Sequence, residues 1–220
     1  MTRGFHNHQS TYKNVDRNFV EWHQGQPYYY IWAVMIDEPC WLKQLAASQR
    51  LLASYLVEDY ARQAHISLLP AGFLGSNSLC METIAHLANQ CSIFDIELGP
   101  LDSFTGSPYH QIIDPTHQLS RLRKAFRPIA ADPNSKVEDA HYVPHLTVGL
   151  YNGVYPLGDI SAEPMISSIP KHPCPPITIT ALSLIRYQTH TIKGPLEEVA
   201  QFGFEAPAPR IYEPSLFIFD

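Results

Sequence analysis

Two short segments of the sequence carry side chains that could perform acid–base chemistry on a phosphate. They read AHISL (residues 64–68) and PHLTV (residues 144–148). In each segment a histidine, an apolar residue, a hydroxyl residue and a second apolar residue follow one another. This alternation is typical of a half-buried strand, in which successive side chains point to opposite faces. We therefore predict that His65 shares a face with Ser67, and His145 with Thr147, about 6–7 Å apart along each strand.

A pair of histidines with a pair of hydroxyls suits in-line displacement at a phosphodiester. One group must take the proton of the attacking oxygen, and another must protonate the leaving oxygen on the opposite side of phosphorus. Histidine titrates near neutral pH, so it can serve in either role. The hydroxyls of Ser67 and Thr147 could hold the non-bridging oxygens as charge develops on them. Such a site requires no metal ion, and we expect neither a metal nor a cofactor.

The tripeptide alone is a weak signal, because a third copy begins at His8 in a polar region without a strand pattern. The strand context of the other two copies is what distinguishes them. On these two motifs the sequence resembles the 2H phosphoesterase superfamily, which includes 2′-5′ RNA ligase-like proteins and cyclic nucleotide phosphodiesterases. The resemblance extends from about Tyr28 to Phe204. It includes an opening strand that ends in Asp-Glu-Pro at residues 37–39.

The resemblance implies a fold and a set of site residues. The fold would be α+β, with two pseudo-symmetric lobes of antiparallel sheet, backed by helices, around a central cleft. His65 and His145 would be the acid–base pair, with Ser67 and Thr147 as the phosphate-holding hydroxyls. Tyr151 lies six residues after His145, on the same face of the expected strand, and would stack on a base of the substrate.

The sequence departs from the family pattern at two points. Family members often carry a basic residue shortly after the second motif, where this chain has Gly149 and Leu150. The first motif has Ser67 where threonine is common, although the hydroxyl is kept. Both departures leave the choice of substrate open.

The expected function is that of a metal-independent phosphoesterase. It would act on a 2′,3′-cyclic phosphate or a 2′-5′ linkage in a small nucleotide or at an RNA end. One alternative is a non-catalytic nucleotide- or RNA-binding module, and another is hydrolysis of a non-nucleotide cyclic phosphate such as an ADP-ribose cyclic phosphate. The acid–base assignment of the two histidines, the regiochemistry of the product, ligation and the oligomeric state stay open.

Hydrophobic patterning predicts the elements that must position these residues. Strands are expected at 28–36, 64–69, 93–98, 109–113, 143–151 and 177–185. Helices are expected from 37–39 to about Tyr60, at 81–91 and at 116–129, with a short helix through Val15, Phe19 and Trp22 and a short helix or turn at 197–202. Residues 1–27 form an N-terminal extension, and residues 28–220 a single bilobal domain. The basic face of the 116–129 helix (Arg121, Arg123, Lys124 and Arg127) is expected to be solvated, with phosphate steering as the alternative.

Composition limits the partners. The chain has 15 Lys and Arg against 21 Asp and Glu, a net charge of −6, which argues against coating long nucleic acid. It has neither an apolar run of about 20 residues nor an N-terminal secretory signal, so we expect a cytoplasmic protein without a membrane partner. Its four cysteines (Cys40, Cys80, Cys91 and Cys174) form no CxxC pair, and we expect buried free thiols rather than disulfides or a zinc site.

Overall fold

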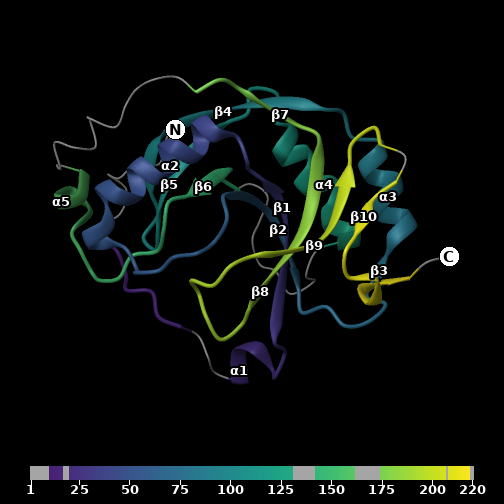
Figure 1. Ribbon diagram of the computed structural model, residues 1–220, viewed down its shortest axis with the longest axis horizontal. Coiled ribbons are helices and arrows are strands. Elements are labelled where there is room, and N and C mark those ends of the chain that lie inside the picture. Colours follow the sequence, from purple (N-terminus) through teal and green to yellow (C-terminus); the bar gives the residue numbers. More distant parts are fainter. Residues whose placement is uncertain (1–9, 17–19, 131–141, 162–173, 207, 219–220) are drawn as a thin grey trace.

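The computed structural model describes residues 10–16, 20–130, 142–161, 174–206 and 208–218 (Figure 1). Two main sheets occupy the middle of the molecule, and helices α2, α3 and α4 pack around them. Neighbouring strands in both main sheets run antiparallel. The α+β fold expected from the sequence is confirmed.

The first main sheet has five strands in the order β10-β9-β8-β1-β2. Their bounds are Tyr28–Met35 for β1, His65–Gly72 for β2, Ala181–Gln188 for β8, Glu197–Gly203 for β9 and Arg210–Ile211 for β10. Strand β2 therefore lies at one edge and carries the first motif. Its edge position also explains why the strand continues through Pro70, which has no N–H to donate to a neighbour.

The second main sheet has four strands in the order β6-β5-β4-β7. Their bounds are Phe94–Ser103 for β4, Pro108–Ile113 for β5, His145–Thr147 for β6 and Ile177–Ile179 for β7. Strand β6 carries the second motif and is again an edge strand. A separate parallel pair joins β3 (Leu79–Cys80) to β11 (Phe217–Ile218).

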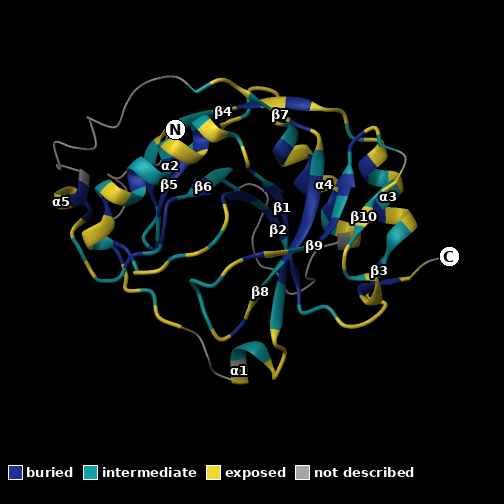
Figure 2. Cartoon of the chain, viewed as in Figure 1, coloured by how far each residue is buried: buried dark blue, intermediate teal, exposed yellow. Residues whose placement is uncertain are grey.

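The helices cover the sheets and close the core. Their bounds are Val20–His23 for α1, Pro39–Leu51 for α2, Met81–Asn89 for α3, Gln118–Ala130 for α4 and Leu157–Ser161 for α5, with 3-10 turns η2 (Ala53–Tyr55) and η5 (Pro214–Leu216). The ring of Trp32 in β1 lies 6.0 Å from that of Phe126 in α4 and 5.7 Å from that of Phe202 in β9. Buried residues follow the central strands, and exposed residues mark the outer faces of α2 and α3 (Figure 2).

Several predicted elements have different limits in the structure. The stretch 177–185 forms two strands rather than one, because β7 pairs with β4 whereas β8 pairs with β1, and Thr180 lies between them. Residues 197–202 form strand β9 rather than a helix or turn. The helix expected to reach Tyr60 ends at Leu51. Strand β4 continues through Gly99 and Pro100, where its register with β5 shifts between Leu98 and Leu101.

Two of the four cysteines form a disulfide, which corrects the expectation of free thiols. Cys40, at the start of α2, is bonded to Cys174, and their Cα atoms are 5.7 Å apart. Beside the disulfide, the indole N–H of Trp41 donates to the carbonyl of Pro175 at 3.1 Å. Cys80 and Cys91 are free. The sequence separation of 134 positions explains why no local spacing revealed the disulfide.

Parts of the N-terminal extension are described, whereas residues 1–9 and 17–19 lie outside the described ranges. Thr11 donates its backbone N–H to the carbonyl of Tyr155 at 2.9 Å. In α1, the ring of Trp22 stacks on that of Tyr29 in β1, with centroids 6.2 Å apart. The described parts of the extension thus pack on the remainder of the chain. Within the described ranges, no helix has the length and apolar character needed to cross a membrane.

Candidate active site

The two motifs lie side by side, because their edge strands β2 and β6 are in contact (Figure 1). The hydroxyl of Tyr142, just before β6, donates to the backbone carbonyl of Ser67 in β2 at 3.1 Å. His65 and Ser67 lie two residues apart on β2, so their side chains share one face. The same holds for His145 and Thr147 on β6. We call these four residues (His65, Ser67, His145 and Thr147) the two-histidine site.

Both imidazoles are oriented by the same local hydrogen bond. The Nδ1 atom of His65 lies 2.8 Å from the carbonyl oxygen of Gln63, and that of His145 lies 2.7 Å from the carbonyl oxygen of Val143. A carbonyl can only accept, so Nδ1 carries the proton in each ring. In the neutral imidazole this leaves the lone pair on Nε2. Nε2 is therefore the nitrogen of each neutral ring that can accept a proton.

Burial favours the neutral form of both imidazoles. His65 is 7% exposed. Burial lowers its pKa to about 4 against the opposing effect of the Gln63 hydrogen bond, and the charges of Arg62 and His145 lower it further. Burial also lowers the pKa of His145, opposed by the hydrogen bond to Val143. Both rings are then neutral at pH 7 until an anion arrives, and a bound phosphate favours the imidazolium.

The two hydroxyl groups of the site are free to bind a ligand. The side chains of Ser67 and Thr147 are half-buried. Within the part of the chain that the structure describes, neither hydroxyl has a hydrogen-bond partner. Each can donate its proton to a phosphate oxygen. Their role as phosphate-holding hydroxyls stays a prediction.

An aromatic and acidic cluster that the sequence reasoning missed surrounds His145. The rings of Phe104 and Tyr109 stack on each other at 4.1 Å, and their centroids lie 5.0 and 5.4 Å from that of His145. The buried carboxylate of Asp102 accepts from the hydroxyl of Tyr109 at 3.2 Å and from the amide of Gln111 at 2.8 Å. Burial and the Asp102 charge raise the pKa of Tyr109. These contacts hold the His145 ring in one orientation.

The only signal for this cluster in the sequence was the alternation within the predicted strand 109–113. Tyr109 is the cross-strand partner of Thr147, and Gln111 is that of His145. Paired residues share a face of a sheet. Residues two apart in the predicted strand could therefore have been placed beside the second motif, but only if the pairing of the two strands had been known.

A β-bulge lies directly after Ser67. Leu69 pairs with Trp32 and Ser67 with Ala33, which leaves Leu68 as an extra residue on β2. Arg123 of α4 donates from Nη1 to the carbonyl of Leu68. The guanidinium carbon of Arg123 also lies 4.9 Å from the centre of the Tyr142 ring. The backbone of the first motif is thus fixed from outside the sheet.

This placement of Arg123 corrects the interpretation of the basic helix. The sequence pattern predicted a solvated or phosphate-steering face that included Arg123. In the structure Arg123 is 2% exposed, whereas Arg121 and Lys124 are exposed. Burial of Arg123 is compensated by its hydrogen bond to the strand and its contact with an aromatic ring.

Tyr151 does not lie where the sequence interpretation put it. Strand β6 ends at Thr147, so Tyr151 is not on the strand face that carries His145. Its side chain is fully buried, and its hydroxyl lies 2.7 Å from Oγ of Ser103. No part of the ring is left exposed to stack on a base. The structure therefore gives Tyr151 a packing role.

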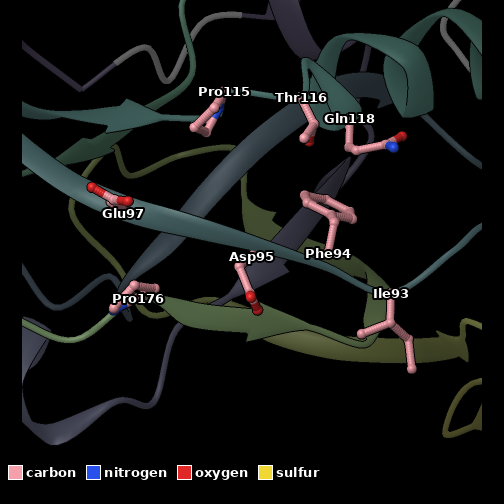
Figure 3. Close-up of a pocket in the computed structure, with 8 residues that line it drawn as sticks. All are labelled: Ile93, Phe94, Asp95, Glu97, Pro115, Thr116, Gln118 and Pro176. Atoms are coloured by element: carbon pink, nitrogen blue, oxygen red, sulfur yellow. The ribbon is translucent and has the colours of Figure 1, made fainter.

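The hollow drawn in Figure 3 is separate from the two-histidine site. Its volume is about 430 Å³, and it lies between β4 and the turn before α4. Asp95 and Glu97 line it from the strand, and Thr116 and Gln118 from the turn and the helix start (Figure 3). None of its lining residues belongs to either motif. Within the described ranges, no group of three His, Cys, Asp or Glu side chains is placed to hold a metal ion.

The family model of the 2′-5′ RNA ligase superfamily matches residues 40–191, a range that contains both motifs. The chain belongs to the 2′-5′ RNA ligase superfamily. Membership confirms the resemblance to 2H phosphoesterases that the two motifs carry. A search of curated protein sequences finds no match.

Solved structures share the fold of this 2′-5′ RNA ligase superfamily chain. The protein TT0787 of Thermus thermophilus matches with a TM-score of 0.53 and 15% identity, over 82% of this chain and 100% of that one. A crystal structure described as a phosphoesterase matches with a TM-score of 0.51 and 13% identity, over 82% and 100%. For apo LigT of E. coli the TM-score is 0.48 and the identity 15%, over 83% and 100%. At these identities the likeness to TT0787 and to the structure described as a phosphoesterase concerns the fold alone.

Proposed function

We propose that this chain is a phosphoesterase that acts on a 2′,3′-cyclic phosphate or a 2′-5′ linkage in a small nucleotide or at an RNA end. His65 and His145 would be the acid–base pair, and no metal ion would be needed. The observation that carries the proposal is the matched pair of imidazoles on adjacent edge strands, each held through Nδ1 by the carbonyl two residues earlier. Two such groups supply both proton transfers that the reaction requires.

The proposed hydrolysis proceeds by in-line attack of water on phosphorus. One neutral imidazole takes a proton from the water as its oxygen bonds to phosphorus. The other, as imidazolium, gives its proton to the leaving ribose oxygen as the P–O bond breaks. The products are a phosphate monoester and a free hydroxyl. The first imidazole is then protonated and the second is neutral. Ser67 and Thr147 donate hydrogen bonds to the non-bridging oxygens.

The surroundings of the two rings favour different roles for them. His65 is deeply buried, and the charges of Arg62 and His145 oppose its protonation, so it stays neutral to low pH and suits the base. His145 is half-buried and suits the acid once the negative phosphate is bound. The aromatic pair packed against His145 restricts the orientation of its ring.

The test is a product assay with purified protein in EDTA. The substrates are the four 2′,3′-cyclic mononucleotides and a 2′-5′-linked dinucleotide. We expect turnover by the wild type, and a loss of about 10²–10⁴-fold in His65→Ala and in His145→Ala. His86→Ala is the matched control, because His86 is exposed on α3. Each variant is checked for folding by circular dichroism.

Three results would count against the proposal. Wild-type rates in a folded His65→Ala or His145→Ala variant would remove that histidine from the mechanism. Loss of wild-type activity on chelation would contradict a metal-free reaction. Binding of cyclic nucleotides without any product would favour the non-catalytic binding module. An ADP-ribose cyclic phosphate belongs in the same panel, since turnover of that compound alone would change the substrate class.

A further inference from the structure

Arg62 lies in a segment that is fixed on both sides. The backbone N–H of Ala61 donates to the carbonyl of Lys193 at 2.8 Å. The side-chain oxygen of Gln63 accepts from the backbone N–H of Leu196 at 2.7 Å, and the carbonyl of Gln63 accepts from the ring of His65. The residues flanking Arg62 are therefore tied to the β8–β9 connection and to the first motif histidine.

The guanidinium of Arg62 is held on an aromatic ring but has no anionic partner among the described residues. Its central carbon lies 4.4 Å from the centre of the Tyr187 ring in β8. Its Nε atom is buried and makes no hydrogen bond within the same ranges. A permanently charged group with donors in a planar fork thus keeps hydrogen-bonding capacity for a ligand.

The same charge acts on the two-histidine site. Tyr187 pairs with Tyr29 and Ser67 with Ala33 across the sheet, and Tyr29 and Ala33 lie four residues apart on β1. By strand alternation Tyr187 and Ser67 therefore lie on one face of the sheet. The charge of Arg62 reaches His65 strongly enough to lower its pKa. An anion bound beside His65 and Ser67 would lie in the field of this cation.

The other nearby arginine is engaged elsewhere. Arg123 donates to the carbonyl of Leu68 and covers the Tyr142 ring, so it supports the strand. After the second motif the sequence continues with Val148, Gly149 and Leu150, which carry no charge. Neither feature supplies a free cation for a phosphate.

We propose that Arg62 is the anion-binding residue of the two-histidine site and donates hydrogen bonds to a phosphate group of the substrate. This inference rests on the proposed function for the identity of the substrate. The ring of Tyr187 presents the guanidinium in a fixed orientation, so little freedom is lost when the phosphate binds. Arginine suits this role because its planar fork matches two phosphate oxygens.

The experiment measures binding of inorganic phosphate by calorimetry and does not depend on turnover. The variants are Arg62→Met, which keeps the apolar stem on Tyr187, and Arg62→Lys, which keeps the charge. Arg121→Met is the control, since Arg121 is exposed on α4. We expect phosphate binding to weaken about tenfold or more in Arg62→Met, to recover in part in Arg62→Lys and to stay unchanged in Arg121→Met.

Two further measurements separate a binding role from a structural one. Histidine titration by NMR should show a higher pKa for His65 in Arg62→Met, because a neighbouring positive charge has been removed. With an active substrate, KM should rise while kcat changes little. Phosphate binding within twofold of wild type in a folded Arg62→Met would overturn the inference, and so would wild-type protein that binds no phosphate. Arg62-dependent phosphate binding without turnover would uphold it and reject the phosphoesterase function.

Discussion

His65 and His145 are equivalent in their local geometry although they belong to different sheets. Each begins an edge strand, and each ring nitrogen Nδ1 is bonded to the carbonyl oxygen of the residue two positions earlier, at 2.8 and 2.7 Å. Because the backbone just before each strand supplies the partner, no further side chain is needed to select the tautomer. The same hydrogen bond therefore leaves the lone pair of Nε2 available for proton transfer in both rings.

The pH dependence of the rate should reflect the lowered pKa values of both histidines. In the free enzyme the base His65 is neutral above about pH 4, and the acid His145 is protonated only below a pKa that lies under 6.5. We expect kcat/KM to peak between these limits and to fall toward neutral pH. The kcat profile should lie at higher pH, since bound phosphate stabilises the imidazolium. A kcat/KM that keeps rising from pH 6.5 to 8 would contradict this assignment.

Stability should also depend on pH, and independently of catalysis. The folded pKa of His65 is about 4, below the value of 6.5 in an unfolded chain. A group of this kind favours unfolding as the pH falls, because the unfolded state binds the proton first. The free energy of unfolding should therefore decrease from pH 6.5 toward pH 4. Urea titrations at pH 7 and pH 5 measure it. A smaller decrease is expected in His65→Asn, and an equal one would show that His65 contributes nothing.

Removing the hydroxyls should affect the rate more than the fold. Ser67→Ala and Thr147→Ala each delete a donor that no described residue uses. We expect each variant to lower kcat by about 10²–10³-fold, the effect of losing one oxyanion donor. Melting temperatures should stay near that of wild type. Ser67→Thr serves as the matched control and should retain activity. Full activity in both alanine variants would mean that these hydroxyls do not touch the phosphate.

The bulge after Ser67 should depend on Arg123. Arg123→Met keeps much of the side-chain volume but removes the hydrogen bond to Leu68. We expect a loss of about 1–3 kcal/mol in the free energy of unfolding, because a buried carbonyl is left without a partner. Turnover should fall as well, since Ser67 is the preceding residue. Lys124→Met, at an exposed position of the same helix, is the comparison. If the two variants were equally stable, the hydrogen bond would not support the bulge.

The disulfide should stabilise the protein measurably. Reduction, or Cys40→Ser, releases the connection before β7 from α2, and we expect a loss of about 2–4 kcal/mol. Cys80→Ser and Cys91→Ser are the controls, because these thiols are free. Disulfides persist mainly in oxidising compartments, which stands against the expectation of a cytoplasmic protein. Alkylation and mass spectrometry of protein taken directly from cells would show whether Cys40 and Cys174 are bonded there.

The sequence predicted the motif strands and most of the helices because their patterns are local. The alternation around His65 and around His145 is visible within five residues, and so is the helical repeat of α3. Features that depend on distant partners were missed. The disulfide joins residues 134 positions apart, and Arg123 is buried because a bulge on β2 needs a donor. A local sequence pattern contains neither the pairing of the two cysteines nor the contact of Arg123 with β2.

The same reasoning explains the errors at strands. Residues 177–180 alternate between apolar and polar side chains, the alternation shifts phase at Ala181 and Leu182, and strand pairing changes at Thr180. Residues 197–202 carry two glutamates at their start, and they become a strand because β8 supplies a partner along their whole length. Tyr151 follows the second motif at an even spacing, but the strand ends at Thr147. Pairing, rather than pattern, decides how far a strand extends.

The single residue between β7 and β8 has a mechanical consequence. Thr180 joins the sheet of His145 to the sheet of His65, and its carbonyl accepts from the N–H of Phe204 at 2.7 Å. The ring of Phe204 stacks on that of Phe94 in the neighbouring sheet, with centroids 6.3 Å apart. The two sheets are thus connected directly at this point, without a linker that could act as a hinge. We expect this direct connection to limit how far the two sheets, and with them His65 and His145, can move apart.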